Sequence, residues 1–204
     1  MFWPYLAGVA SVGGVWILGG FGAGAWNPLA FVDGADGRPS SSKLQWLLWL
    51  GAAFFGYVAV AVSTHSLAKL QVPQNLLLCL GFSAATMTAA KTVTVSFINS
   101  GRLSKRSATA RIPLQKSLSC LLTDDSGAPD LSKLQMLAWT LLAIGAYLVA
   151  ISTAIKAGRD LTEMPDVDST LMMLMGLGQG GYLGKKIVTV GTDAASRDPF
   201  ALVR

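Results

Sequence analysis

Five long apolar stretches, separated by shorter polar segments, dominate the pattern along this chain. They run from Trp3 to Trp26, from Leu44 to about Val62, from Leu76 to about Val95, from Leu134 to about Ile155 and from Leu171 to about Val190. A membrane-spanning helix needs about 20 mainly apolar residues to cross roughly 30 Å of hydrocarbon. The pattern therefore predicts an all-α polytopic membrane protein with about five transmembrane helices.

The first stretch carries no charge and has aromatic residues at both ends, Trp3 and Tyr5 at one and Trp26 at the other. Aromatic residues at the ends of an apolar segment are typical of the two membrane–water interfaces. A cleaved signal peptide is the alternative interpretation, but such peptides have a basic segment before the apolar run, and here there is none. We interpret residues 3–26 as a retained span.

An internal duplication covers the other four stretches. Residues 37–57 match residues 127–147 at an offset of 90, and the later arm matches at an offset of 95. Matched pairs include Gly37/Gly127, Pro39/Pro129, Ser42/Ser132, Lys43/Lys133, Gln45/Gln135, Trp49/Trp139, Gly81/Gly176 and Lys91/Lys186. Because two spans separate equivalent points, the two copies have the same orientation, which predicts a pseudo-twofold axis along the membrane normal.

The duplication predicts the organisation of the chain. We expect an N-terminal transmembrane helix (1–26), a first two-helix repeat (27–95), a basic cytoplasmic connection (96–126), a second two-helix repeat (127–190) and a cytoplasmic tail (191–204). The last four helices then form two tandem helical hairpins of parallel orientation. Leucines at helical spacing after Pro113 make the connection either an amphipathic helix on the inner leaflet or a docking segment.

The repeated motif G-x-P-x-x-S-K-L-Q-x-L-x-W, together with LMGLGQGGYLGKK after the second outer loop, resembles an uncharacterised family of bacterial integral membrane proteins. The resemblance covers roughly residues 30 to 190. It implies a helical bundle in the bacterial inner membrane, and it implies no activity, cofactor or functional residue. The first repeat departs from the pattern in its return arm, where Ser83 and Thr86 stand opposite Gly178 and Gly181.

Charge is scarce and unevenly placed. Charged residues make up 13% of the chain and hydrophobic residues 52%, which excludes an ordinary soluble domain. If residues 96–131 are cytoplasmic, that side holds 13 of the 16 basic residues. The positive-inside rule then places the N-terminus outside and the C-terminus in the cytoplasm of a multi-pass protein. The net charge of +5 is explained by this topology and by attraction to anionic lipid at the cytoplasmic face, so it gives no support for nucleic acid.

Lys91 and Lys186 lie unusually deep in their apolar stretches. Each stands 15 residues after the matched Leu76 or Leu171, which is about 23 Å of helix and short of a 30 Å core. One interpretation is that both ammonium groups snorkel to lipid phosphate. The other is that an oligomer arranges Lys91 and Lys186, with the neighbouring Lys185, around a vestibule that attracts anions.

Small and polar residues in the return arms are candidate packing or pore positions. Gln179 is an amide inside an apolar stretch, so we expect it to bond to another helix, and Tyr182 lies beside it. Close helix packing is expected at Gly20, Gly24, Gly81, Gly176, Gly180 and Gly184. The alternative for this arm is a hydroxyl-lined path.

The Ser-Lys-Leu-Gln motif predicts a capping box at the start of each ingoing helix. A serine at the N-cap accepts a bond from a free amide, and a glutamine three residues later reaches back, which gives Ser42 with Gln45 and Ser132 with Gln135. The nearby aspartates lack the spacing of a calcium loop.

The residues give no catalytic or metal motif. His65 is the only histidine, and Cys79 and Cys120 have no metal-ligand spacing. We therefore expect no catalytic residues, cofactor or metal. The sequence predicts a non-enzymatic scaffold or anchor subunit that forms a homo-oligomer or joins a larger membrane complex. The alternative is an oligomeric channel or transporter for small or anionic solutes lined by the return helices, and a membrane enzyme ranks third.

Overall fold

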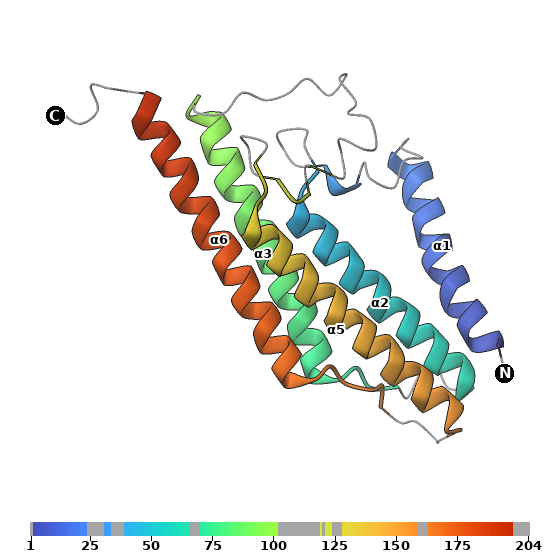
Figure 1. The fold of residues 1–204 in the computed structure, drawn as a ribbon. Helices are drawn as coiled ribbons and strands as arrows, with labels where there is room; N and C mark the ends of the chain where they lie inside the picture. The colour runs from blue at the N-terminus through green and yellow to red at the C-terminus, as the bar shows by residue number, and fades with distance from the viewer. Residues whose placement is uncertain are drawn as a thin grey trace.

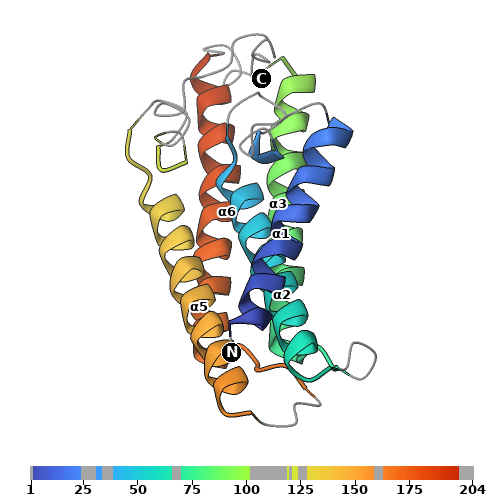
Figure 2. The ribbon, with the colours of Figure 1, turned by 90° about the vertical axis from the view of Figure 1, so that its right-hand side faces the viewer.

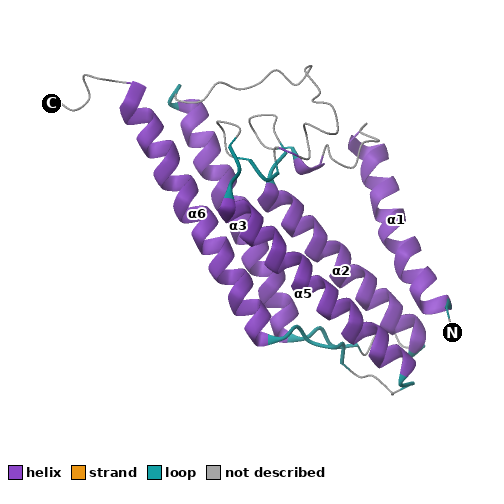
Figure 3. Ribbon diagram, viewed as in Figure 1, coloured by secondary structure: helices purple, strands orange, loops and turns teal. Residues whose placement is uncertain are grey.

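The computed structural model is all-helical in the part of the chain that it describes: residues 2–23, 31–33, 39–65, 70–101, 119, 121–123, 128–158 and 163–197 (Figure 3). Five helices follow one another in these described residues, and for them the prediction of an all-α fold is confirmed. They are α1 (Trp3–Ala23), α2 (Ser41–Ser63), α3 (Gln74–Asn99), α5 (Leu131–Lys156) and α6 (Ser169–Arg197).

Three of these helices, α2, α3 and α5, are long and apolar enough to cross a membrane. The sequence prediction of five spans goes further than this finding. Helix α1 is rich in glycine and opens on Trp3-Pro4-Tyr5, and α6 contains two adjacent lysines beside several glycines. The lysines and glycines make α6 the least apolar of the five described helices, whereas α1 is the most apolar of them, and both exceed 20 residues.

Helices α2, α3, α5 and α6 form a bundle, and α1 lies along its edge against α2 (Figures 1 and 2). Helix α2 contacts α3 and α5, and α6 contacts α5 and α3. In Figure 1, α2 and α5 start at the end of the bundle where α3 and α6 finish. We refer to this end as the entry end, and to the end with the α2–α3 and α5–α6 turns as the turn end.

The core of the bundle consists of two groups of buried side chains. The larger group includes Trp49, Leu76, Tyr147 and Met175, one from each helix of the bundle. Trp49 donates its indole N–H to Met175 Sδ at 3.0 Å, and its ring centroid lies 6.4 Å from that of Tyr147. The smaller group joins Ala90 to Met136, Leu137 and Tyr182. The core therefore contains one fully buried aromatic residue from each of α2 and α5, Trp49 and Tyr147, with Tyr57 and Trp139 partly buried against them.

The turn end joins the two hairpins. Asp168 precedes α6, and its Oδ1 accepts the backbone N–H groups of Thr170 (2.9 Å) and Leu171 (3.1 Å). Pro73 precedes α3 and has no such oxygen, so Asp166 of the other hairpin supplies one and accepts the Leu76 N–H at 3.1 Å. Asn75 also donates to the Val167 carbonyl at 2.9 Å. The first turn of α3 is thus capped by the α5–α6 connection.

The predicted capping boxes are wrong. Helix α5 is capped by Asp130 and not by Ser132, and the side chain of Ser40, the residue before α2, makes no capping bond. Gln45 is fully buried and donates to Thr140 Oγ1 at 2.8 Å, whereas Gln135 is exposed. Each helix begins two residues earlier than the motif implied, which moves Ser42 and Ser132 inside the first turn.

Four of the six predicted packing glycines make no close contact with the described residues. A Cβ added at Gly81, Gly176, Gly180 or Gly184 would meet nothing within 4 Å. Gly20 is buried, and Gly24 lies outside the described residues. Close approach occurs at Gly56, where an added Cβ would lie 2.6 Å from the Tyr147 hydroxyl, and at Gly178, where it would lie 3.4 Å from Met136 Cα. Glycine spacing on a helix does not specify which face meets a neighbour.

Candidate functional site

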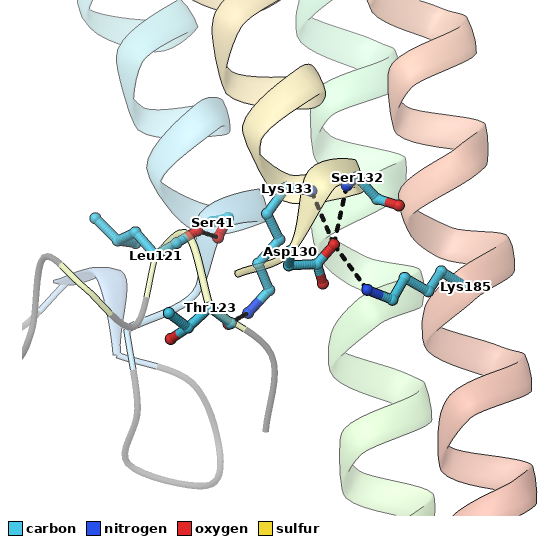
Figure 4. Close-up of polar contacts among 7 residues, drawn as sticks. All are labelled: Ser41, Leu121, Thr123, Asp130, Ser132, Lys133 and Lys185. Carbon is cyan, nitrogen blue, oxygen red and sulfur yellow. Dashed lines mark hydrogen bonds and ion pairs between the residues drawn. The ribbon is translucent and has the colours of Figure 1, made fainter. Parts of the chain in front are cut away.

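Asp130 is the centre of a polar cluster at the entry end of the bundle (Figure 4). It has extended backbone dihedrals, φ −107° and ψ 104°, just before the first helical residue of α5. Its Oδ1 accepts the N–H groups of Ser132 at 2.9 Å and Lys133 at 3.3 Å. A carboxylate at this position satisfies amides that have no partner inside the helix and also interacts favourably with the helix dipole.

The same carboxylate oxygen pairs with Lys185 of α6. Lys185 Nζ lies 3.0 Å from Asp130 Oδ1, and the Asp130 side chain is only 6% exposed against 39% for Lys185. Figure 4 shows the lysine reaching across from α6 to the start of α5. The ion pair thus restricts sliding of α6 along α5. Because Lys185 is partly exposed, it keeps part of its hydration, which lowers the desolvation cost of the pair.

Two lysines hold the segments before α2 and α5 in the same way. Lys133 Nζ donates to the Thr123 carbonyl at 2.6 Å, and Lys43 Nζ donates to the Asp33 carbonyl. Each lysine lies in the first turn of its helix and bonds to a backbone oxygen ten residues earlier. Ser41 Oγ, also in the first turn of α2, donates to the Leu121 carbonyl at 2.7 Å.

The other lysines predicted as pore or lipid contacts have different surroundings. Lys186 Nζ lies 6.0 Å from the centroid of the Tyr182 ring, one turn earlier on α6. Lys91 is exposed on α3, and among the described residues it has no hydrogen bond or ion pair. The five candidates therefore do not form one group: Lys185 belongs to the Asp130 cluster, Lys186 pairs with Tyr182, Gln179 lies inside the bundle, and Lys91 faces outward.

Gln179 bonds to another helix, as expected from its place in an apolar stretch. It is 3% exposed, and its Oε1 accepts the Thr86 hydroxyl at 3.0 Å. Its Nε2 donates to Ser83 Oγ at 3.4 Å. Ser83 and Thr86 of α3 stand in the sequence repeat opposite Gly178 and Gly181 of α6. The hydroxyls of one return arm thus face the amide of the other.

Two buried polar atoms in the described part of the bundle have no hydrogen-bond partner: Gln45 Oε1 and the Tyr147 hydroxyl. Both lie between α2 and α5, where Gln45 meets Thr140 and Tyr147 meets Gly56. Unsatisfied buried groups of this kind cost roughly 1–3 kcal/mol each.

The described residues include few side chains that could bind a metal ion or act as a nucleophile. They contain no group of three or more histidine, cysteine or acidic side chains able to hold a metal ion. Cys79 is free and buried in the core, and Cys120 lies outside the described residues. His65 is exposed at the end of α2 with φ 52°.

The sequence interpretation missed the Asp130–Lys185 pair. Asp130 is one of the aspartates near the helix starts that lack the spacing of a calcium loop, and the sequence predicts Lys185 only as a pore or lipid contact. The signal that could have revealed the cap is an aspartate directly before an apolar helix, two residues ahead of the serine. No local signal identifies Lys185 as its partner, because 55 positions of sequence separate the two residues.

Comparison with known proteins gives no family assignment: no family model, curated protein or solved structure matches the chain.

Proposed function

We propose that this chain is a non-enzymatic integral membrane protein that acts as a scaffold or anchor subunit. In this proposal all five helices cross a bacterial inner membrane, with the entry end of the bundle in the cytoplasm and the N-terminus outside. Helices α2–α3 and α5–α6 are then the two hairpins of the sequence duplication. The apolar length of α2, α3 and α5 supports the embedding, and the lysines of the entry end support the orientation.

The observation that carries the scaffold interpretation is the pairing of polar side chains between helices of the bundle. Gln179 bonds to Ser83 and Thr86 between α6 and α3, and Gln45 bonds to Thr140 between α2 and α5. These side chains are at most 3% exposed. Within hydrocarbon, polar groups paired in this way hold helices together. Residues expected to line a path are therefore used in packing.

The outward face of α6 supports assembly with a second copy of the chain. Met173, Leu177 and Ile187 are 57–71% exposed, and Gly180 and Gly184 lie between them with open space at their Cβ positions. These five residues follow one another at spacings of four, three, four and three, so they form one seam along the helix. Helix α3 exposes Leu78 and Phe82 at the positions that correspond to Met173 and Leu177.

The oligomeric state of the purified full chain in lipid nanodiscs tests this proposal. We expect a dimer or larger homo-oligomer that Gly180→Leu and Gly184→Leu reduce to monomer without unfolding. The matched control is Gly145→Leu on α5, where an added Cβ also meets nothing. A wild-type monomer that purifies without any stoichiometric partner would contradict the proposal.

The alternative is an oligomeric channel or transporter for small or anionic solutes, and the exposure of Lys91 on α3 is the observation that favours it. Anion flux into vesicles that contain the purified chain separates the two functions. The scaffold proposal expects flux no higher than in empty vesicles. Flux that Lys91→Met lowers, in a protein that still assembles, would establish the alternative.

A further inference from the structure

The exposed surface of α3 becomes polar near the entry end. Thr88, Lys91 and Thr92 are all exposed there, and we call them the α3 patch. Lys91 and Thr92 follow Thr88 by three and four residues, so both lie next to Thr88 on one side of the helix. The corresponding residues of α6 are Leu183, Lys186 and Ile187, which surround the lysine with apolar side chains.

The depth of the α3 patch follows from its neighbour Ala90. Ala90 is 2% exposed and packs in the smaller core group with Met136, and Leu44 packs against that group. Leu44 and Met136 belong to the first two turns of α2 and α5. The α3 patch therefore lies where these helices begin, at the level at which a bilayer around the bundle changes from hydrocarbon to headgroups.

The contrast with α6 indicates what Lys91 lacks inside the chain. Lys186 lies over the Tyr182 ring, and the residue at that position of α3 is Met87. Lys185 pairs with Asp130, whereas the corresponding residues of the first repeat are Ala90 and Ser40. Both cations of α6 are thus engaged by groups that have no counterpart at the corresponding positions of the first repeat. A lysine on the lipid-facing side of a span, near its end, extends to the headgroup region, where lipid phosphates are available to it.

We propose that the α3 patch binds the phosphate group of an anionic phospholipid in the leaflet at the entry end. Lys91 supplies the charge. The Thr88 and Thr92 hydroxyls donate to the carbonyls of Ala84 (2.9 Å) and Thr88 (3.0 Å), so their oxygens present acceptors to the glycerol hydroxyls of a headgroup. The proposal rests on the membrane embedding described under the proposed function.

Competition between lipids for the full chain in detergent tests the α3 patch. Native mass spectrometry measures how much phosphatidylglycerol and phosphatidylcholine remain bound from an equal mixture. We expect the wild type to prefer phosphatidylglycerol and Lys91→Met to reduce that preference about fivefold, because one lysine near a lipid surface contributes on the order of 1 kcal/mol. Lys91→Arg should keep the preference.

Lys186→Met is the matched control and should change the preference less than twofold. Equal losses in Lys91→Met and Lys186→Met would overturn the proposal, since they would indicate diffuse attraction to basic residues. Displacement of phosphatidylglycerol by millimolar inorganic phosphate would also overturn it, because the site would then take a free anion. Thr88→Val/Thr92→Val keeps the charge and should lower the preference about twofold.

Alkaline carbonate extraction of membranes separates failure of this proposal from failure of the membrane embedding. A chain that resists extraction yet binds both lipids equally contradicts the α3 patch alone. A chain that carbonate releases contradicts the embedding and the α3 patch together.

Discussion

The two return helices, α3 and α6, have corresponding sequences but different contacts. Helix α6 carries the amide of Gln179 and the glycines Gly178 and Gly181, while α3 carries hydroxyls at Ser83 and Thr86. The amide of one bonds to the hydroxyls of the other. Near the entry end, α6 has cations that the chain itself engages, and α3 has one that it leaves exposed. Helices α3 and α6 are therefore complementary where they meet and different where they face outward.

Among the variants that test this difference between α3 and α6, Gly178→Leu should cause the largest loss of stability. An added Cβ would lie 3.4 Å from Met136 Cα and 3.7 Å from its backbone nitrogen, so a leucine would push α6 away from α5. We expect a loss of about 3 kcal/mol in the free energy of unfolding, measured by denaturant titration in mixed micelles. Gly176→Leu, two residues away in open space, should leave stability nearly unchanged. Equal losses would show that α6 does not approach α5 at Gly178.

Asp130→Ala should cost about 2 kcal/mol, because it removes the cap of α5 and leaves Lys185 without its carboxylate. The matched change in the first repeat is Ser40→Ala, whose side chain makes no capping bond and which should cost under about 0.5 kcal/mol. Unfolding of both variants at low and high salt provides the measurement. The loss in Asp130→Ala should shrink as salt screens the ion pair in the wild type.

Thr86→Val and Gln179→Leu should each lower stability by about 1 kcal/mol. Both remove the hydrogen bond between α3 and α6, and polar pairs between membrane helices contribute on the order of 0.6–1.7 kcal/mol. The double variant should lose less than the two single losses combined, which a double-mutant cycle measures as coupling. Strictly additive losses would indicate that the two side chains act separately.

Ser132→Ala should have the smallest effect, under about 0.5 kcal/mol. The bond to Asp130 uses the backbone N–H of Ser132, which alanine retains. Thermal unfolding compared with Asp130→Ala gives the measurement. A loss of stability as large as that of Asp130→Ala would indicate that the Ser132 side chain, and not Asp130, caps α5.

The helices could be predicted from the sequence because hydropathy is summed over some twenty residues, and single errors average out. The entry-end site could not, because it depends on one residue. A shift of the first helical residue from Lys133 to Leu131 makes Asp130 the cap and turns Ser132 into an ordinary first-turn residue. The prediction that Gln179 bonds to another helix is correct, because an amide inside an apolar stretch is buried against a neighbouring helix and needs a polar partner there. Its partners Ser83 and Thr86 required the positions of α3 and α6.

The caps at the turn end and the entry end have a consequence for the order of assembly during synthesis. The second hairpin caps its own helices, with Asp130 on α5 and Asp168 on α6. The first hairpin depends on later residues. Asp166 accepts the Leu76 N–H and so caps α3, and the Leu121 carbonyl accepts the Ser41 hydroxyl at the start of α2. The ribosome makes the first hairpin earlier, yet these partners emerge only afterwards. The N-terminal half of the protein is thus synthesised first, but these two of its hydrogen bonds form only after residues of the C-terminal half have been made.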